Sequence, residues 1–197
     1  DILGSSVGMD KEVMKRLLRD SNIPVSRWVS FRRHEVANFP YNEVSKDLGK
    51  ILFIKPANMG SSIGVHKVTN EKEYVAAIQD AFQYDNKIVV EEQIKGREIE
   101  CSVLGNETPK ASLPGEVIVQ SKDGFYSYDA KYVDDNGAST KIPADLPQQL
   151  IKRIQETAIQ TFKTLCCEGM ARVDMFVTDD EKIYINEINT IPGFTNI

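Results

Sequence analysis

Two short segments near the end of the sequence bring together residue types that bind magnesium and phosphate. The first holds Arg172 and Asp174, and the second holds Glu187 and Asn189, followed shortly by Gly193. Mg²⁺ prefers octahedral oxygen coordination and is usually held by one or two carboxylates together with substrate phosphates. The two carboxylates and the amide oxygen of Asn189 therefore form a candidate magnesium site, beside which Arg172 supplies a fixed cation.

Two antiparallel strands are predicted to position these residues. Residues 170–177 and 182–188 are rich in Val, Ile, Phe and Tyr and are separated by a polar turn. Because alternate residues of a strand share a face, Arg172 and Asp174 are expected on one side of the first strand, and Glu187 and Asn189 on one side of the second. Pairing can then bring the two sets into one cluster. The alternative is a solvated sheet edge, since charged side chains lie mostly at the surface.

Length and composition predict one large domain or two small ones with hydrophobic cores. The 197 residues are 41% hydrophobic and 27% charged, with a net charge of −5. This acidic balance gives no indication of nucleic-acid binding, and neither a membrane-length apolar run nor a signal peptide is visible. The three cysteines lack zinc-site spacing and are expected to be reduced thiols of a cytoplasmic protein.

The order of predicted elements indicates an α+β fold of two lobes. Helices are predicted over residues 10–20, 41–48, 71–82 and 147–165. Strands are predicted over residues 26–31, 51–55, 63–68, 88–92, 97–105 and 113–121. A loop is expected over 122–142, and residues 2–6 are expected to end an earlier connection. We expect the lobes to span 1–93 and 94–197, with a ligand site in the cleft between them.

A run of small residues follows the strand predicted over 51–55. Lys55 ends this strand, and Gly60-Ser61-Ser62-Ile63-Gly64 lets the backbone approach a ligand closely. The segment is not a Walker A motif, because the lysine precedes the glycines and no Gly-Lys-Ser/Thr follows. It is a candidate phosphate-covering loop, although an ordinary Gly/Ser hairpin has the same composition.

Two further stretches give weaker signals. The connection from Glu91 to Ile94 can present backbone groups to an adenine, and Glu98 can meet ribose hydroxyls, but carboxylates alone are more often solvated charges. Lys131 lies in an aromatic-rich loop, Tyr126 to Tyr132. Long ordered loops are often lids that exclude water from a reaction, and the alternative is a surface loop pinned by its rings.

Taken together, these motifs resemble those of ATP-grasp proteins, and among them the D-alanine–D-alanine ligase family. The resemblance covers essentially the whole chain. It rests on Met9-Asp10-Lys11, Phe53-Ile54-Lys55-Pro56, Gly60-Ser61-Ser62-Ile63-Gly64, Glu91 to Glu98, Tyr128-Asp129-Ala130-Lys131-Tyr132, Arg172-Val173-Asp174 and Asn186 to Gly193.

This resemblance implies a role for each candidate residue. The phosphates of ATP would meet Lys11, Lys55, Lys131, Ser61 and Ser62. The adenine would meet Glu91, Glu92, Gln93, Ile94, Phe125 and Phe176, and the ribose Glu98. Two Mg²⁺ ions, or Mn²⁺, would be held by Asp174, Glu187 and Asn189. Catalysis would use Arg172 and the Gly193 N–H as oxyanion donors, with Ser61 and Tyr132 linking the covering loop to the lid.

The resemblance also implies a reaction. In such ligases ATP phosphorylates the carboxylate of one D-alanine, and the amine of a second attacks the acylphosphate through a tetrahedral intermediate, giving D-alanyl-D-alanine for peptidoglycan. It implies a cytoplasmic enzyme, homodimeric at full length, with small-molecule substrates and neither nucleic acid nor membrane as partner. Tyr132 favours D-alanine over D-lactate as acceptor.

Two departures from the family pattern shape these expectations. The family normally begins with a further α/β domain and continues beyond the Pro-Gly turn, and the sequence contains neither part. We therefore expect nucleotide binding to survive better than ligation in this chain. The alternatives are a related ligase with another acceptor, such as D-serine, and a nucleotide-binding module without ligase activity.

Overall fold

The computed structural model describes residues 1–119 and 138–193, which divide into two compact units. One unit is Ser26–Gln93, and the other joins Asp1–Val25 to the residues from Ile94 onwards. The division after Gln93 coincides with the expected lobe boundary. Residues 1–25, however, group with the second unit and not with the first, because Met14, Leu18 and Ile23 are buried in its core.

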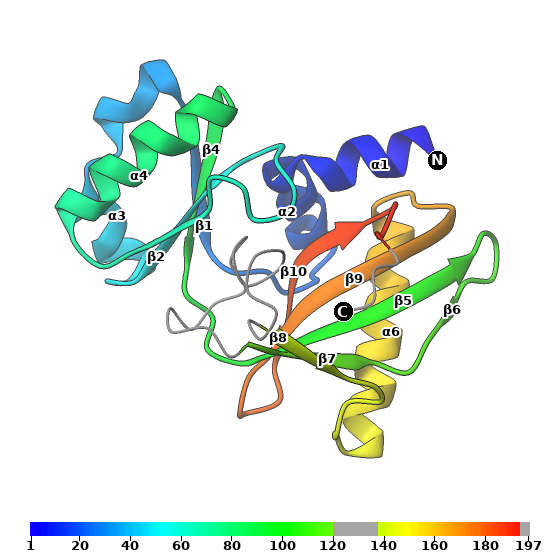
Figure 1. Ribbon diagram of the computed structural model, residues 1–197. Helices are drawn as coiled ribbons and strands as arrows, with labels where there is room; N and C mark the ends of the chain where they lie inside the picture. The colour runs from blue at the N-terminus through cyan, green and yellow to red at the C-terminus, as the bar shows by residue number, and fades with distance from the viewer. Residues whose placement is uncertain (120–137, 194–197) are drawn as a thin grey trace. The chain divides into compact units, whose positions relative to one another are not determined.

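The Ser26–Gln93 unit is an antiparallel sheet with helices packed against it (Figure 1). Its strands, in spatial order, are β1 (Trp28–Arg32), β4 (Lys87–Glu92), β2 (Leu52–Pro56) and β3 (His66–Val68). Its helices are η1 (Arg33–Asn38), α3 (Tyr41–Leu48) and α4 (Glu71–Tyr84). The helices share one core with alternate strand residues such as Leu52, Ile54, Ile88 and Val90.

Local sequence explains this arrangement. The Asn70 side chain accepts a hydrogen bond from the Glu73 N–H and caps α4, whose apolar residues recur at helical spacing. In β2 every second side chain is buried in the core, so Phe53 and Lys55 project from the other face. The predicted helices 41–48 and 71–82 are confirmed, with α4 ending two residues later than expected.

The second unit is built on a larger antiparallel sheet. Its strands, in spatial order, are β10 (Ile183–Asn189), β9 (Gly169–Val177), β5 (Arg97–Gly105), β7 (Gly115–Val119) and β8 (Ala138–Lys141), with β6 (Lys110–Ala111) also paired to β5. The hairpin of β9 and β10 was predicted from sequence. The prediction of a loop over 122–142 was wrong for residues 138–141, which pair with β7.

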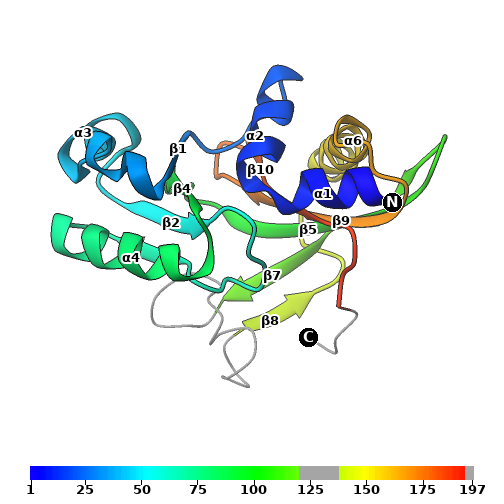
Figure 2. The same ribbon diagram turned by 90° about the horizontal axis from the view of Figure 1, so that it is seen from above.

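Helix α6 (Gln148–Thr164) lies along one face of this sheet (Figures 1 and 2). The helix predicted over 147–165 is confirmed, and its apolar face covers the sheet: Ile154, Ala158 and Phe162 are fully buried with odd-numbered strand residues such as Val173 and Met175. The even-numbered residues of β9 therefore face away from α6. No helix within the described ranges has both the length and the hydrophobicity to cross a membrane.

Two helices open the chain, α1 (Ile2–Met9) and α2 (Lys11–Asp20). The prediction that residues 2–6 end a connection was wrong, because the Asp1 side chain accepts the Leu3 and Gly4 N–H groups and starts a helix there. Small residues let α1 approach its neighbours: a Cβ on Gly8 would lie 2.7 Å from Cγ2 of Ile188 in β10. Helix α1 thus packs directly on β10.

Candidate functional site

The hairpin of β9 and β10 brings the four candidate residues of the opening motif together. In the antiparallel register Asp174 lies opposite Glu187, and Arg172 lies opposite Asn189. Directly opposed residues in such a ladder have Cβ atoms about 4.5–5.5 Å apart and point to the same face. All four side chains are partly buried, so they form one polar cluster on the sheet face turned away from α6.

A β-bulge in β10 makes this pairing possible. Ile185 is paired with Met175, but the next pair is Glu187 with Asp174, so Asn186 is an extra residue. Without the bulge, Asn186 would oppose Asp174, and Glu187 would point to the α6 side. Bulges recur beside active sites, where they redirect a side chain.

Arg172 is held by two carboxylates. Its Nε lies 2.7 Å from Oδ1 of Asp174 and its Nη2 lies 2.7 Å from Oδ2, which is a bidentate pair. Its Nη2 also lies 3.4 Å from Oε1 of Glu100 in β5. Burial disfavours the charged guanidinium, but these carboxylates and Glu187 outweigh it, so the pKa of Arg172 is raised and its charge is permanent.

At Asp174 the influences on the pKa favour the neutral form. Burial is the largest influence on its pKa and raises it, and the charges of Glu100 and Glu187 raise it further, while Arg172 lowers it. The pKa of Asp174 therefore lies above its ordinary value. Three carboxylates surround one guanidinium here, so the cluster favours the arrival of another positive charge.

The side-chain oxygens of Asp174, Glu187 and Asn189 suit Mg²⁺, because this ion is usually bound by few protein ligands. Within residues 1–119 and 138–193 no three His, Cys, Asp or Glu side chains form a metal-binding group. The candidate set instead consists of two carboxylates and one amide, leaving other positions to phosphates and water. The Asn189 Oδ1 accepts the Ile191 N–H at 3.1 Å, which fixes the orientation of this amide at the start of the final turn.

The other predicted site residues in the unit of the larger sheet are Glu98, Phe176, Lys11 and Gly193. Glu98 of β5 is opposite Phe176 of β9, and both are half-buried, on the same sheet face as the cluster. Lys11 is the first residue of α2 and is largely buried. Gly193 is exposed, four residues beyond the end of β10.

The candidate residues of the Ser26–Gln93 unit centre on Lys55. Its Nζ lies 3.1 Å from Oε2 of Glu91, to which the Ser26 hydroxyl donates at 3.0 Å. The Glu92 carboxylate accepts hydrogen bonds from the backbone N–H and the Nε–H of Arg27. The carboxylates of Glu91 and Glu92 thus have protein partners within the unit. Gln93 and Ile94 follow β4 and are partly buried.

The loop from Gly60 to Gly64 has a strained backbone. Ser61 and Ser62 have φ of +52° and +57°, a conformation costly for residues with a Cβ. Gly64, at φ +67°, is closely packed, since a Cβ there would lie 2.7 Å from Cδ2 of Tyr84. The strand predicted over 63–68 begins only at His66, because Ile63 and Val65 donate to turns. Backbone strain of this kind clusters at ligand-binding loops, so the segment stays a candidate phosphate-covering loop.

Three predicted residues, Phe125, Lys131 and Tyr132, lie outside the described residues. Among the described residues, Glu100 is a candidate site residue that the sequence did not predict. It lies opposite Asp174 in the register of β5 and β9. The strict alternation of Glu98, Glu100 and Ser102 with apolar residues along β5 was a usable signal, because it places Glu100 on the same face as Glu98.

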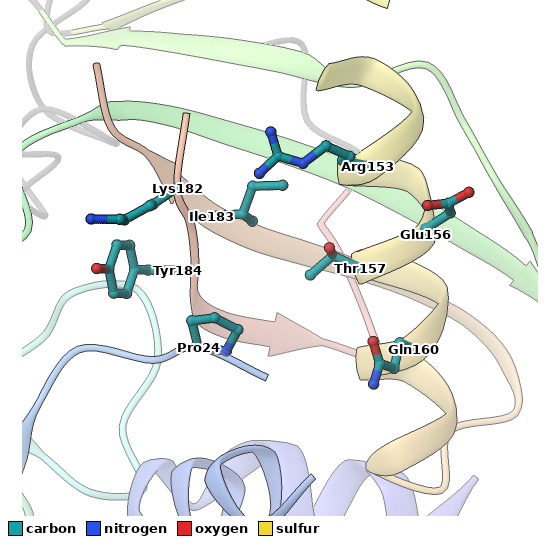
Figure 3. A pocket seen from close by; sticks show the side chains of 8 residues that line it. All are labelled: Pro24, Arg153, Glu156, Thr157, Gln160, Lys182, Ile183 and Tyr184. Carbon is teal, nitrogen blue, oxygen red and sulfur yellow. The ribbon is translucent and has the colours of Figure 1, made fainter. Parts of the chain in front are cut away.

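A hollow lies on the α6 side of the sheet, between α6 and the start of β10 (Figure 3). Its volume is about 350 Å³, and Arg153 and Lys182 are among its lining residues. Both cations have a carboxylate partner: Arg153 Nη1 lies 3.4 Å from Oε2 of Glu181, and Lys182 Nζ lies 2.8 Å from Oδ2 of Asp180. This hollow therefore offers little net charge to an anion.

Known proteins of one family resemble this chain over its whole length. Residues 17–197 match the family described as D-ala D-ala ligase C-terminus. The D-alanine–D-alanine ligase of Shouchella clausii is 54% identical over 197 residues, and ligase A of Escherichia coli K12 is 49% identical over 197 residues. Both alignments include 100% of this chain but only 53% and 54% of those proteins, so the chain spans about half their length.

Solved structures show the same relationship. The D-alanine–D-alanine ligase of Coxiella burnetii superposes with a TM-score of 0.83 at 40% identity, covering 100% of this chain and 52% of that one. The VanG D-Ala:D-Ser ligase of Enterococcus faecalis gives 0.87 at 40% identity, covering 99% and 56%.

The two antiparallel sheets, each packed with helices, are those of an ATP-grasp protein. Within that class the match over residues 17–197 is decisive, and the chain belongs to the D-alanine–D-alanine ligase family.

Proposed function

We propose that the protein containing this chain joins two D-alanines to D-alanyl-D-alanine at the expense of ATP, for peptidoglycan synthesis. The observation that carries this proposal is the cluster of Arg172 and Asp174 opposite Asn189 and Glu187. It combines metal-binding oxygens with a permanent cation, which phosphoryl and acyl transfer both require. Relatives at about half sequence identity carry the name of this ligase.

The proposed nucleotide contacts follow the predicted roles. Phosphates are assigned to Lys11, Lys55, Lys131, Ser61 and Ser62, adenine to Glu91, Glu92, Gln93, Ile94, Phe125 and Phe176, and ribose to Glu98. The carboxylates of Glu91 and Glu92 already have partners in the unit. Their backbone groups are therefore the parts assigned to adenine.

Two Mg²⁺ ions, or Mn²⁺, when bound by Asp174, Glu187 and Asn189, would neutralise phosphate charge and polarise the transferring group. The chain's own residues supply the rest. Arg172 keeps its charge at any working pH because its pKa is raised, so it can donate to an oxyanion without losing a proton. The exposed Gly193 is assigned the second donor, through its backbone N–H.

Acceptor choice defines a second candidate function. The VanG D-Ala:D-Ser ligase is 40% identical to this chain, as is the D-alanine–D-alanine ligase of Coxiella burnetii, so identity does not separate the acceptors. Tyr132 favours D-alanine. The predicted cytoplasmic location and homodimer stay predictions.

The test measures phosphate and dipeptide together. The full-length protein and the 197-residue chain are incubated with ATP, Mg²⁺ and D-alanine, with D-serine or D-lactate as alternative second substrates. We expect D-alanyl-D-alanine from the full-length protein, loss of at least tenfold in rate for Glu187→Gln, and an unchanged rate for the exposed control Glu156→Gln. A full-length protein that forms neither phosphate nor D-alanyl-D-alanine contradicts the proposal. Preferential use of D-serine selects the second candidate.

A further inference from the structure

Glu100 completes a row of three carboxylates across three strands. In the ladder it lies opposite Asp174, which in turn lies opposite Glu187. Like charges directly opposed in a sheet repel each other, so this row needs cations to be stable. Arg172, two residues before Asp174 in β9, reaches two of the three: it is hydrogen-bonded to Asp174 and lies 3.4 Å from Glu100.

The contacts of Arg172 conflict with a metal-binding role for Asp174. Both carboxylate oxygens of Asp174 accept hydrogen bonds from Arg172, each at 2.7 Å. To bind a divalent cation, Asp174 must turn at least one oxygen away from the guanidinium. Arg172 is only 27% exposed, so it then requires another protein acceptor to stay oriented.

Glu100 meets that requirement. The Nη2 of Arg172 carries two hydrogens, so one can point to Asp174 and the other to Glu100. The side chain of Glu100 is 27% exposed, the same fraction as that of Arg172. A shift of a few tenths of an ångström would convert the 3.4 Å contact into an ordinary charged hydrogen bond.

We infer that Glu100 is a positioning residue, which holds Arg172 in place when Asp174 turns to the metal. The inference rests on the proposed function for its biological meaning, but it concerns a contact that exists without any ligand. It predicts that Glu100 acts through Arg172 and not as a metal ligand itself. Two experiments separate these roles.

The first experiment needs no metal or nucleotide. In ¹⁵N-labelled chain, the Nη–H signal of Arg172 is identified by its loss in Arg172→Lys, and its hydrogen-exchange rate is measured. Asp174→Asn mimics a neutralised Asp174. We expect a protected signal in Asp174→Asn and at least tenfold faster exchange when Glu100→Gln is added, while adding Glu156→Gln changes nothing. The inference is overturned if Asp174→Asn alone already makes the Arg172 signal exchange fast, or if Glu100→Gln does not change the exchange rate in that background.

The second experiment measures Mn²⁺ binding with ATP by electron paramagnetic resonance. We expect Glu100→Gln to lower Mn²⁺ affinity about tenfold, because Asp174 must then remain with Arg172. In an Arg172→Gln background, Glu100→Gln should have no further effect. An equal loss in both backgrounds would make Glu100 act on the metal directly and overturn the inference. Absence of Mn²⁺ binding by the wild type counts against the proposed function, while the metal-free measurement still decides the role of Glu100.

Discussion

Asp174 and Glu187 lie opposite each other in the pairing of β9 and β10, and the extra residue Asn186 in β10 is what aligns them. The bulge turns Glu187 from the α6 side of the sheet to the polar side. It also keeps Ile183, Ile185 and Ile188 buried, although their spacing changes from two to three. One inserted residue thus serves the core and the candidate metal site at once.

Asn189 is expected to have two separable roles. Its Oδ1 accepts a hydrogen bond from the Ile191 N–H, and the same oxygen is the proposed metal ligand. Asn189→Asp keeps an acceptor and an oxygen ligand, whereas Asn189→Leu removes both. We expect Asn189→Leu to lower Mn²⁺ affinity at least about tenfold and Asn189→Asp to retain it. Equal affinity of wild type and Asn189→Leu would exclude Asn189 from the metal site.

Gly64 is expected to be essential for the shape of the covering loop. Its φ of +67° and the nearby ring of Tyr84 leave no room for a side chain. Gly64→Ala should lower the free energy of unfolding by about 1–2 kcal/mol from backbone strain alone. Gly60, whose added Cβ would meet nothing within 4 Å, is the matched control. Urea unfolding of both variants checks this, and a Gly64→Ala variant as stable as Gly60→Ala would contradict it.

Glu116 should make stability depend on pH. Hydrogen bonds from Arg97, at 2.7 and 2.6 Å, hold the pKa of Glu116 below its usual range. Because the folded pKa is the lower one, this contribution is present above the unfolded pKa of about 4.3 and is lost as pH falls through the folded value. We expect Glu116→Gln to cost about 1 kcal/mol at pH 7, allowing for screening of the partly exposed Arg97.

The measurement for Glu116 is urea unfolding of wild type and variant between pH 3.5 and 7. The difference in unfolding free energy should shrink toward the acid end. Glu156→Gln, which alters an exposed helix pair, should stay within about 0.5 kcal/mol of wild type throughout. A Glu116→Gln difference that does not change with pH would show that the charge of this carboxylate is unimportant.

The three cysteines should react with thiol reagents at very different rates. Cys166 is exposed, whereas burial raises the pKa of Cys101 to about 11 and that of Cys167 to about 11. Only the thiolate is a nucleophile, so the native chain at pH 8 should show one fast thiol and two slow ones. Urea should make all three fast, and Cys166→Ser should remove the fast phase. Two fast thiols in the native wild type would contradict the burial of Cys101 or Cys167.

The sequence predicted those elements whose formation depends on residues close together in the chain. Asp10 caps α2 and Asn70 caps α4 as their types suggest, and the stripe of α6 follows from its 3.6-residue period. The capping role of Asp1 escaped prediction because small residues such as Gly4 and Gly8 are poor helix formers. Their value is apparent only in the tertiary structure, where Gly4 lies against Cys167 and Gly8 against Ile188 of β10, and the absence of a side chain allows close packing.

The sequence by itself determined the residue types of the candidate site and the two strands that carry Arg172 and Asp174, Glu187 and Asn189. Hydrophobic alternation and hard oxygen ligands are properties of short segments, so they can be identified without a fold. The tertiary structure alone decided which residues oppose each other: the bulge at Asn186 set the β10 register, and the pairing of β5 with β9 placed Glu100 beside Arg172. Register depends on contacts between strands far apart in the chain, and a shift of one residue moves every side chain to the other face.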